Sequence, residues 1–368
     1  MIKDEKLKKL SNILVNHSLN VKKGDNVSIS FPIEAKELVE VLIEDISLVS
    51  ANCYLNIYDC NLDAKISKMM NDSRIDILRR RREVDVECFN KFIQISYNYN
   101  DYEDKNKNLD VFKKIKLALH DINEVRINER DWVLLNYPSN LDAYLNKMPF
   151  EEFYNFAMDV MTVDYKKMNE DMKSLKELME KTDKVHIVGN GTDLEFSIKG
   201  LPAIICSGEK NIPDGEVYTA PVKDSVNGVI LYNTPSPYDG HVYHDVKLTF
   251  KDGKIVEAVC SDDNVELNKI FDTDDGSRYV GEFSFGLNPK ILHPMGDILY
   301  DEKIKGSIHF TPGCSYDDCN NGNKSTVHWD LVLIQREDYG GGEIYFDDVL
   351  IRKDGKFILD SLKHLNYE

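Results

Sequence analysis

The first half of the chain alternates between two hydrophobic periodicities. Residues 3–18 place apolar side chains at intervals of three and four, the spacing that lines one face of a helix. Residues 27–31 instead alternate between apolar and polar positions, as a strand does. A helical pattern over 34–50 and an alternating pattern over 53–59 then repeat this order. A strand, a helix and a second strand in succession predict a parallel or mixed sheet with helices on its faces.

Further elements of both kinds follow up to residue 183. The pattern predicts strands at 91–96 and 131–136, a helix around 104–120, and a long, highly charged set of helices through 150–181. We expect these charged helices to lead into the second half of the chain. Residues 1–183 are therefore predicted to form an α/β domain.

The pattern changes from about residue 184. Short alternating segments, broken by glycine and aspartate, replace the helical periodicity. The tetrapeptide KDGK occurs at 251–254 and at 353–356, each time between two alternating apolar runs, which is typical of a hairpin turn. Residues 184–368 are therefore predicted to form a second, strand-rich α+β domain.

Charge and composition narrow the function. The 368 residues include 46 Lys and Arg against 64 Asp and Glu, a formal net charge of −18. This balance argues against nucleic acid and anionic membranes as partners, and it favours metal ions or substrates with a free amine. The sequence has no apolar run of transmembrane length, and its N-terminal residues lack the apolar segment of a secretory signal. Seven scattered cysteines are typical of reduced thiols, so we expect a cytoplasmic protein.

A histidine and a carboxylate stand two residues apart near the end of the second half. They are His328 and Asp330 in the run VHWDLVLI, which has the pattern of a strand. The two side chains are therefore predicted to share one face, with Trp329 on the other. Such a pair suits a divalent metal ion such as zinc, although a polar strand face has the same pattern.

Further candidates lie upstream at junctions between turns and strands. Glu216 and Glu282 each follow a glycine, which permits close backbone approach. His309 precedes a Pro-Gly break, with Glu302 seven residues before it and Tyr316 seven residues after it. Together with the downstream pair, this makes two histidines and four carboxylates. That set is large enough for two divalent ions that share a bridging carboxylate.

Four blocks of the second half resemble, in order, the aminopeptidase T and aminopeptidase S family of dinuclear metallo-aminopeptidases. They are NIPDGEVYTAP, VGEFSFGLNP, ILYDEKIKGSIHFTPG and NKSTVHWDLVLI. Outside these four blocks, VKKGDNVSIS, WVLLNYPS and GTDLEFSIKG are also similar to the family. The resemblance covers nearly the whole chain, and it implies a metal-binding second domain and a homodimer.

The resemblance also implies a role for each candidate residue. Six residues match the family's metal-binding positions: Glu216, Glu282, Glu302, His309, His328 and Asp330. Glu282 matches the carboxylate that bridges two divalent ions (Zn, Co, Mn or Mg), and Tyr316 matches a catalytic tyrosine. No other glutamate or histidine stands out as a general base, so we expect Glu216 to share that role.

The sequence leaves three functions open. The first is a metal-dependent aminopeptidase that acts on peptides with a free N-terminus. The second is a non-catalytic, metal-stabilised binding protein, and the third is a hydrolase of another small amide or ester. The presence of Tyr316 beside all the candidate ligands favours the enzyme. Two further histidines, His241 and His244, are expected to be surface residues.

Overall fold

The computed structural model describes residues 2–99 and 109–367. These residues form two compact units: the first extends to Thr162 and includes Gly208–Ile212, and the second comprises Val163–Ser207 and the chain from Pro213 onward. The predicted boundary after residue 183 follows helix α9 (Tyr165–Met179), whereas this helix belongs to the second unit. The reason is that its buried side chains lie on strands β7 and β9 of that unit. No helix in the described ranges is both long and apolar enough to cross a membrane.

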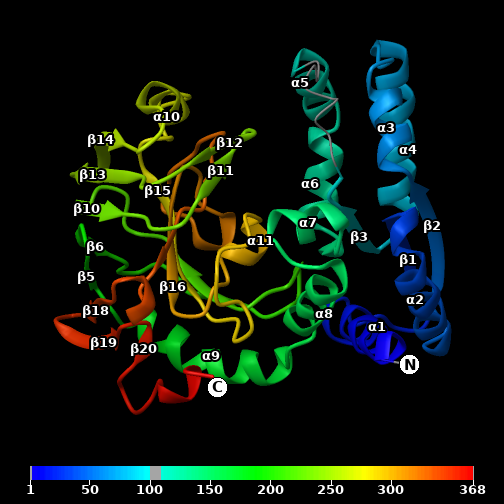
Figure 1. Ribbon diagram of the computed structural model, residues 1–368. Helices are drawn as coiled ribbons and strands as arrows, with labels where there is room; N and C mark the ends of the chain where they lie inside the picture. The colour runs from blue at the N-terminus through cyan, green and yellow to red at the C-terminus, as the bar shows by residue number, and fades with distance from the viewer. Residues whose placement is uncertain (1, 100–108, 368) are drawn as a thin grey trace. The chain divides into compact units, whose positions relative to one another are not determined.

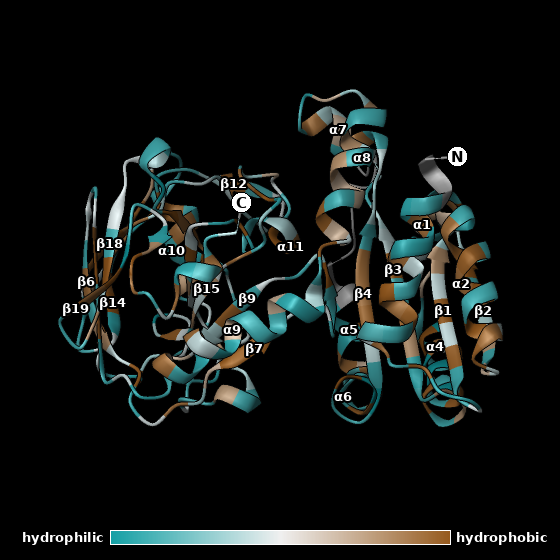
Figure 2. Ribbon diagram, turned by 90° about the horizontal axis from the view of Figure 1, so that it is seen from below, coloured by the Kyte–Doolittle hydropathy of each residue, from teal (hydrophilic) through white to brown (hydrophobic). Residues whose placement is uncertain are grey.

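The first unit contains a parallel sheet, as the sequence predicts. Its strand order is β2-β1-β3-β4-β8, and every neighbouring pair is parallel. Figure 1 shows β1 and β2 with helix α2 beside them, and Figure 2 shows hydrophobic residues along β1 and β4. The strands have these bounds: β1 (Asn26–Pro32), β2 (Asn52–Tyr58), β3 (Lys91–Tyr97), β4 (Asp131–Tyr137) and β8 (Asn211–Ile212).

Helices connect these strands. The predicted helix at 3–18 begins as an α-helix and ends in a π-helical turn (Ile13–Ser18), and the one at 104–120 is confirmed from Leu109, its earlier residues lying outside the described ranges. Among the helices that the sequence did not predict, α3 and α4 bury almost no side chain and so lack an apolar stripe. The bounds are α1 (Ile2–Asn12), α2 (Lys36–Leu48), α3 (Cys60–Ser67), α4 (Asp72–Cys88), α5 (Leu109–Ala118), α6 (His120–Asn128), α7 (Asn140–Leu145) and α8 (Phe150–Met161).

The second unit contains two larger antiparallel sheets and a two-stranded one. The eight-stranded sheet has the order β14-β13-β10-β6-β5-β18-β19-β20, and the five-stranded sheet has the order β17-β16-β15-β9-β7. The strands of the first are β5 (Lys184–Gly189), β6 (Thr192–Ser197), β10 (Asn227–Leu231), β13 (Lys247–Lys251), β14 (Lys254–Val259), β18 (Gly342–Phe346), β19 (Val349–Lys353) and β20 (Lys356–Phe357). Those of the second are β7 (Ile204–Cys206), β9 (Glu216–Thr219), β15 (Val280–Gly286), β16 (Ser307–Pro312) and β17 (Val332–Ile334). The remaining elements are the pair β11 (Ser236–Tyr238) and β12 (His241–Tyr243) and the helices α10 (Asn264–Phe271) and α11 (Ile298–Asp301).

Both KDGK segments form the predicted hairpin turns. The first joins β13 to β14 and the second joins β19 to β20. In the first turn Asp252 has φ +50° and Gly253 has φ +81°, and in the second turn Asp354 has φ +49° and Gly355 has φ +76°. Positive φ at both central residues is the requirement of a type I′ turn.

Aromatic side chains join the two larger sheets. Phe283 and Phe310, from neighbouring strands of the five-stranded sheet, both pack on Phe196 of the eight-stranded sheet, with ring centroids 5.0 and 4.9 Å away. Phe250 of the larger sheet also packs on Phe310. One face of the five-stranded sheet is therefore filled by this core. Since side chains alternate between the faces of a strand, the intervening residues point to the opposite face.

Candidate metal centre

The opposite face of the five-stranded sheet carries polar side chains. In the antiparallel register, Ser284 pairs with His309 and Glu282 pairs with Thr311, so all four side chains share one face. Glu216, the first residue of the adjacent strand β9, lies on the same face. The sheet thus brings together three of the predicted ligands from three neighbouring strands.

Glycine is required directly before Glu216 and directly before Glu282. Gly215 has φ +130°, a backbone conformation that residues with a side chain rarely adopt, and a Cβ atom there would lie 3.2 Å from the backbone nitrogen of Asn288. At Gly281 a Cβ atom would lie 2.1 Å from the carbonyl oxygen of Cys314. Both positions therefore exclude a side chain. The prediction that glycine permits a close backbone approach before Glu216 and Glu282 is confirmed.

The segment with His328 and Asp330 is less regular than predicted. Only Val332–Ile334 forms a strand with β16, and His328 makes an isolated bridge with Gly313. The predicted continuous strand over VHWDLVLI is wrong for its first residues, because the chain there pairs at single points. The two side chains still lie on one side, with His328 Nε2 3.3 Å from Asp330 Oδ1. Trp329 is buried on the other side among aromatic rings.

All six predicted ligands converge in the second unit. His309 Nε2 lies 3.1 Å from Glu282 Oε1 and 3.4 Å from Glu216 Oε2, and His328 Nε2 lies 3.3 Å from Glu282 Oε2. Glu302, directly after α11, belongs to the same cluster, because its carboxylate lies near the ligand atoms of His309 and Asp330. Three overlapping groups have ligand atoms within 4.8 Å of one another: Glu216, Glu282 and His309; Glu282, His328 and Asp330; Glu302, His309 and Asp330.

This donor set fits divalent metal ions. It offers four carboxylates and two imidazoles, a mixture of oxygen and nitrogen donors that several divalent ions accept. Burial raises the pKa of Glu302 to about 8, so this carboxyl would lose its proton on metal binding. The four ionised carboxylates then carry four negative charges, which two divalent ions would balance. Glu282, His309 and Asp330 each belong to two of the three groups, and Glu282 has one oxygen beside each histidine, which is the arrangement that a bridging carboxylate needs.

Charge within the cluster raises the pKa of both histidines. Burial opposes the protonated form, but the charge of Glu282 and its hydrogen bond raise the pKa of His309 to about 9. Likewise, despite burial, Asp330 raises the pKa of His328 well above its ordinary value. The pKa of Glu282 is lowered, against burial, mainly by His309. Without metal, protons on the imidazoles therefore compensate the carboxylates, and metal ions compete with those protons.

Hydrogen-bond partners other than the six side chains fix the orientation of the candidate ligands. His309 Nδ1 lies 3.2 Å from the carbonyl oxygen of Glu302, which leaves Nε2 facing the carboxylates. His328 Nδ1 lies 2.9 Å from the carbonyl oxygen of Cys314. The hydroxyl of Thr311 donates a hydrogen bond of 2.7 Å to Asp330 Oδ1. Such outer partners are typical of metal-binding histidines and carboxylates.

Tyr316 lies at the more accessible side of the cluster. Its hydroxyl is 3.1 Å from His328 Nε2, and its ring packs on the His328 ring and on Tyr218. Tyr316 is 45% exposed, whereas Glu282 is 3% exposed and His309 is 1% exposed. The cluster is therefore open to solvent on the side of Tyr316 and His328.

A buried lysine is the main feature that the sequence did not reveal. Lys303 has no solvent exposure, and its ammonium group donates a 2.8 Å hydrogen bond to Glu216 Oε1 and another to Glu302. Asp214 Oδ1 lies 4.0 Å away. Although burial opposes the charged form, these carboxylates raise the pKa of Lys303 well above its ordinary value. The only sequence signal was its position directly after Glu302.

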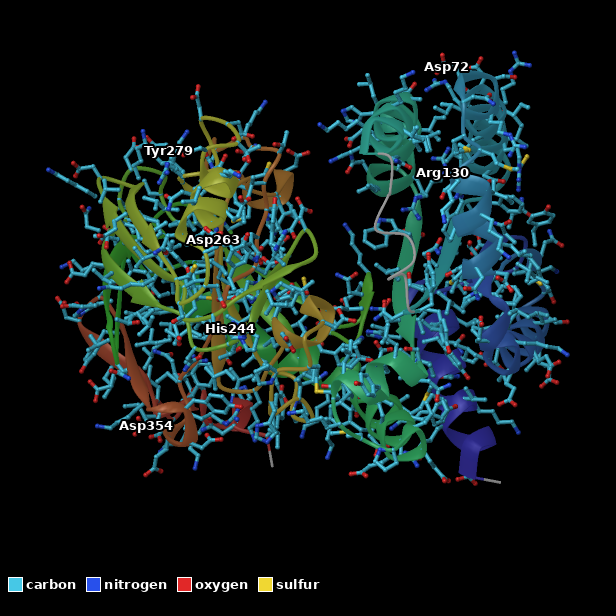
Figure 3. The ribbon with its side chains drawn as sticks, turned by 45° about the horizontal axis from the view of Figure 1, so that its top comes forward. Asp72, Arg130, His244, Asp263, Tyr279 and Asp354 are labelled. Atoms are coloured by element: carbon cyan, nitrogen blue, oxygen red, sulfur yellow. The ribbon has the colours of Figure 1, made fainter. Side chains whose placement is uncertain are left out.

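The remaining histidines of the second unit lie outside this cluster. His244, labelled in Figure 3, is exposed and its Nδ1 lies 3.2 Å from Asp262 Oδ2. His241 is also exposed. The expectation that both are surface residues is confirmed.

Comparison with known proteins identifies the family. Residues 3–357 match the sequence profile of the thermophilic metalloproteases (M29). The chain belongs to this family. The aminopeptidase family resemblance found in the sequence is thereby confirmed.

Individual relatives differ in how much of the chain they match. Aminopeptidase 2 of Geobacillus stearothermophilus is 32% identical over 40% of this chain and 37% of its own length. Aminopeptidase T of Thermus aquaticus is 27% identical over 42% of this chain and 43% of its own length. Aminopeptidase PepS of Streptococcus thermophilus is 22% identical over 89% of this chain and 92% of its own length. The match to the first two therefore spans less than half of each relative.

A solved structure shows that the fold is shared. Wild-type AmpT from Thermus thermophilus superposes with a TM-score of 0.81, covering 97% of this chain and 100% of that chain at 20% identity. The predicted fold class, an α/β first half followed by a strand-rich second half, is confirmed by this match and by the sheets described above.

Proposed function

We propose that this M29 member is a metal-dependent aminopeptidase that removes the N-terminal residue from peptides at a dinuclear centre. The observation that carries the proposal is the convergence of the six predicted ligands on one side of the second unit. Membership of a metalloprotease family supports it, as do the relatives named as aminopeptidases. In this proposal Glu282 would bridge the two ions. Zn, Co, Mn and Mg are the candidates, because a mixed set of oxygen and nitrogen donors suits several divalent ions.

Two divalent ions would lower the pKa of water to produce a nucleophile and would polarise the scissile carbonyl. The chain's own residues would hold and orient the reacting groups. The backbone carbonyl oxygens of Glu302 and Cys314 lie next to the Nδ1 atoms of the two histidines. They thereby keep the Nε2 atoms of His309 and His328 directed into the cluster. Glu216 Oε2 faces His309, where it can accept a proton from the nucleophile and share the role of general base.

Tyr316 is placed to act on the substrate carbonyl. Its hydroxyl lies beside His328 on the accessible side, and the surrounding desolvation together with the charge of Glu282 raises its pKa well above the ordinary value. The phenol therefore stays protonated and can donate a hydrogen bond. A donor in this position would stabilise the oxyanion that develops during peptide hydrolysis.

The charge of the protein agrees with an amine-bearing substrate. The chain carries a net charge of −18, and the cluster itself is rich in carboxylates. The free α-amine of a peptide can bind one of the ions or a nearby carboxylate. Either contact would confine attack to the first peptide bond.

Two finer expectations remain predictions. All seven cysteines are free thiols, which supports a cytoplasmic location. The homodimer implied by the family resemblance is tested by the mass of the protein in solution.

A panel of aminoacyl chromogenic substrates tests the proposed function. The ion-free protein should be inactive, and added Zn, Co, Mn or Mg should restore release of the chromophore from substrates with a free amine. The same substrates with an acetylated amine should remain intact. If the protein binds metal but cleaves none of them, it is a metal-stabilised binding protein. Cleavage of acetylated or ester substrates instead would indicate a different hydrolase.

A further inference from the structure

A second group of metal-donor atoms lies directly beside the proposed centre. The ligand atoms of Cys206, Asp214 and Glu216 lie within 4.8 Å of one another, which is the spacing of residues that share one metal ion. Asp214 and Glu216 are buried, and Cys206 is partly buried. Of this group only Glu216 belongs to the six predicted ligands.

A positive charge already lies against this group. The ammonium of Lys303 donates to Glu216 Oε1 at 2.8 Å and lies 4.0 Å from Asp214 Oδ1. Burial raises the pKa of the Cys206 thiol well above its ordinary value, and the charge of Lys303 opposes that rise. A fully buried ammonium is stable only when carboxylates surround it, and here they do so on more than one side.

The same contacts orient Glu216 toward the proposed centre. Because Lys303 engages Oε1 and the hydroxyl of Ser284 donates to Oε2 at 3.1 Å, the carboxylate is held on both oxygens. Oε2 then lies 3.4 Å from His309 Nε2. Lys303 also donates to Glu302, so one ammonium connects two predicted ligands that belong to different donor groups.

We infer that Lys303 is a built-in cation that takes the place of a third metal ion. Its ammonium fills the group formed by Cys206, Asp214 and Glu216, and it thereby limits the cluster to the ions held by the six predicted ligands. The charges agree with this role. One ammonium balances one of five negative charges, and two divalent ions would balance the other four. The five carboxylates are Asp214, Glu216, Glu282, Glu302 and Asp330. The inference rests on the proposed function only in that the six-residue centre binds divalent ions.

Cadmium binding to the ion-free protein tests this role. Cadmium binds thiolates and produces an ultraviolet charge-transfer absorption, which reports on Cys206 directly. Lys303→Ala removes the ammonium and opens space, so it should bind one more cadmium ion per chain than the wild type and acquire the absorption. The double variant Lys303→Ala/Cys206→Ser should lose both the extra ion and the absorption. The bound ions are counted by mass spectrometry after gel filtration.

A matched control comes from the first unit. Lys91 is also buried, and it forms ion pairs with Asp131 and Asp25, but it is outside every metal-donor group found among the described residues. Lys91→Ala should therefore bind cadmium as the wild type does. The inference is overturned if Lys303→Ala gains no ion, or if the wild type already shows an absorption of equal size that Cys206→Ser removes.

A second variant covers the case in which Lys303→Ala does not fold. Lys303→Met keeps most of the side-chain volume but removes the positive charge. One more carboxylate charge is then unbalanced, so divalent ions should raise the melting temperature of this variant by more than they raise that of the wild type. An equal rise in both proteins would contradict the inference.

Failure of this inference and failure of the proposed function give different results. If the wild type binds cadmium and cleaves peptides, and Lys303→Ala binds the same number of ions, only the role of Lys303 is refuted. A wild type that binds metal without cleaving peptides refutes only the proposed function.

Discussion

Replacing Glu282 by glutamine should remove the connection between the two proposed ions. Glu282 is 3% exposed, and its two oxygens lie 3.1 Å from His309 Nε2 and 3.3 Å from His328 Nε2. Glutamine has the same shape but no charge. The substitution therefore tests the charge of the bridge with little change in packing.

The size of the effect follows from the charge that is lost. At an effective dielectric constant of about 20, a carboxylate about 4 Å from one unit of positive charge contributes about 4 kcal/mol, and a divalent ion carries two such units. The loss of one unit's contribution, about 4 kcal/mol, already weakens binding of an ion roughly 10³-fold, so this value is the lower bound of the effect. We therefore expect Glu282→Gln to retain at least one ion fewer than the wild type at a metal concentration that saturates the wild type. Peptide hydrolysis should be abolished with it.

Metal analysis and kinetics on the same preparation decide this prediction. Both proteins are dialysed against one buffered zinc concentration, the bound metal is counted, and turnover of an aminoacyl chromogenic substrate is measured. Glu257→Gln is the matched control, because Glu257 is an exposed carboxylate of the same unit in strand β14 and should change neither value. Full metal content together with full turnover in Glu282→Gln would show that Glu282 is not the bridge.

Two further predictions concern Tyr316 and the histidines. Tyr316→Phe should lower turnover roughly 10²- to 10³-fold with little change in KM, because an oxyanion donor acts mainly in the transition state. Its metal content should equal that of the wild type, and a loss of metal would instead make the phenol a ligand. The pKa of His309 is raised to about 9 and that of His328 well above its ordinary value, so in ion-free protein both are protonated at neutral pH and must lose their protons to bind metal. Burial also raises the pKa of Glu302 to about 8, so this carboxyl must lose a proton as well. Metal affinity should therefore rise with pH between about 6.5 and 9, with about three protons released per chain near neutral pH in calorimetry with buffers of different ionisation enthalpy. The stabilisation of the ion-free protein by the charged imidazoles should be complete below about pH 6.5 and lost above about pH 9. Metal uptake without proton release would contradict the charged state of the imidazoles.

The sequence alone determined the type of several elements and the face on which some side chains lie. Alternation of apolar and polar residues is a local property, so it identified the parallel strands of the first half and the hairpins at both KDGK turns. It also separated His328 and Asp330 from Trp329, which occupies the apolar side. The six predicted ligands came from short blocks of the chain, each recognisable without knowledge of the others.

Tertiary structure alone decided which distant residues meet. The domain boundary was predicted after α9 because the periodicity of a helix reveals that it has a buried face but not which sheet covers that face. Helices α3 and α4 were missed since they have almost no buried side chain to give a pattern. Lys303 shows the same limit at the site. It reads as one of several charged residues in DEKIKG, and it becomes a fully buried cation only because the sheet places Glu216, 87 residues earlier in the chain, 2.8 Å from its ammonium.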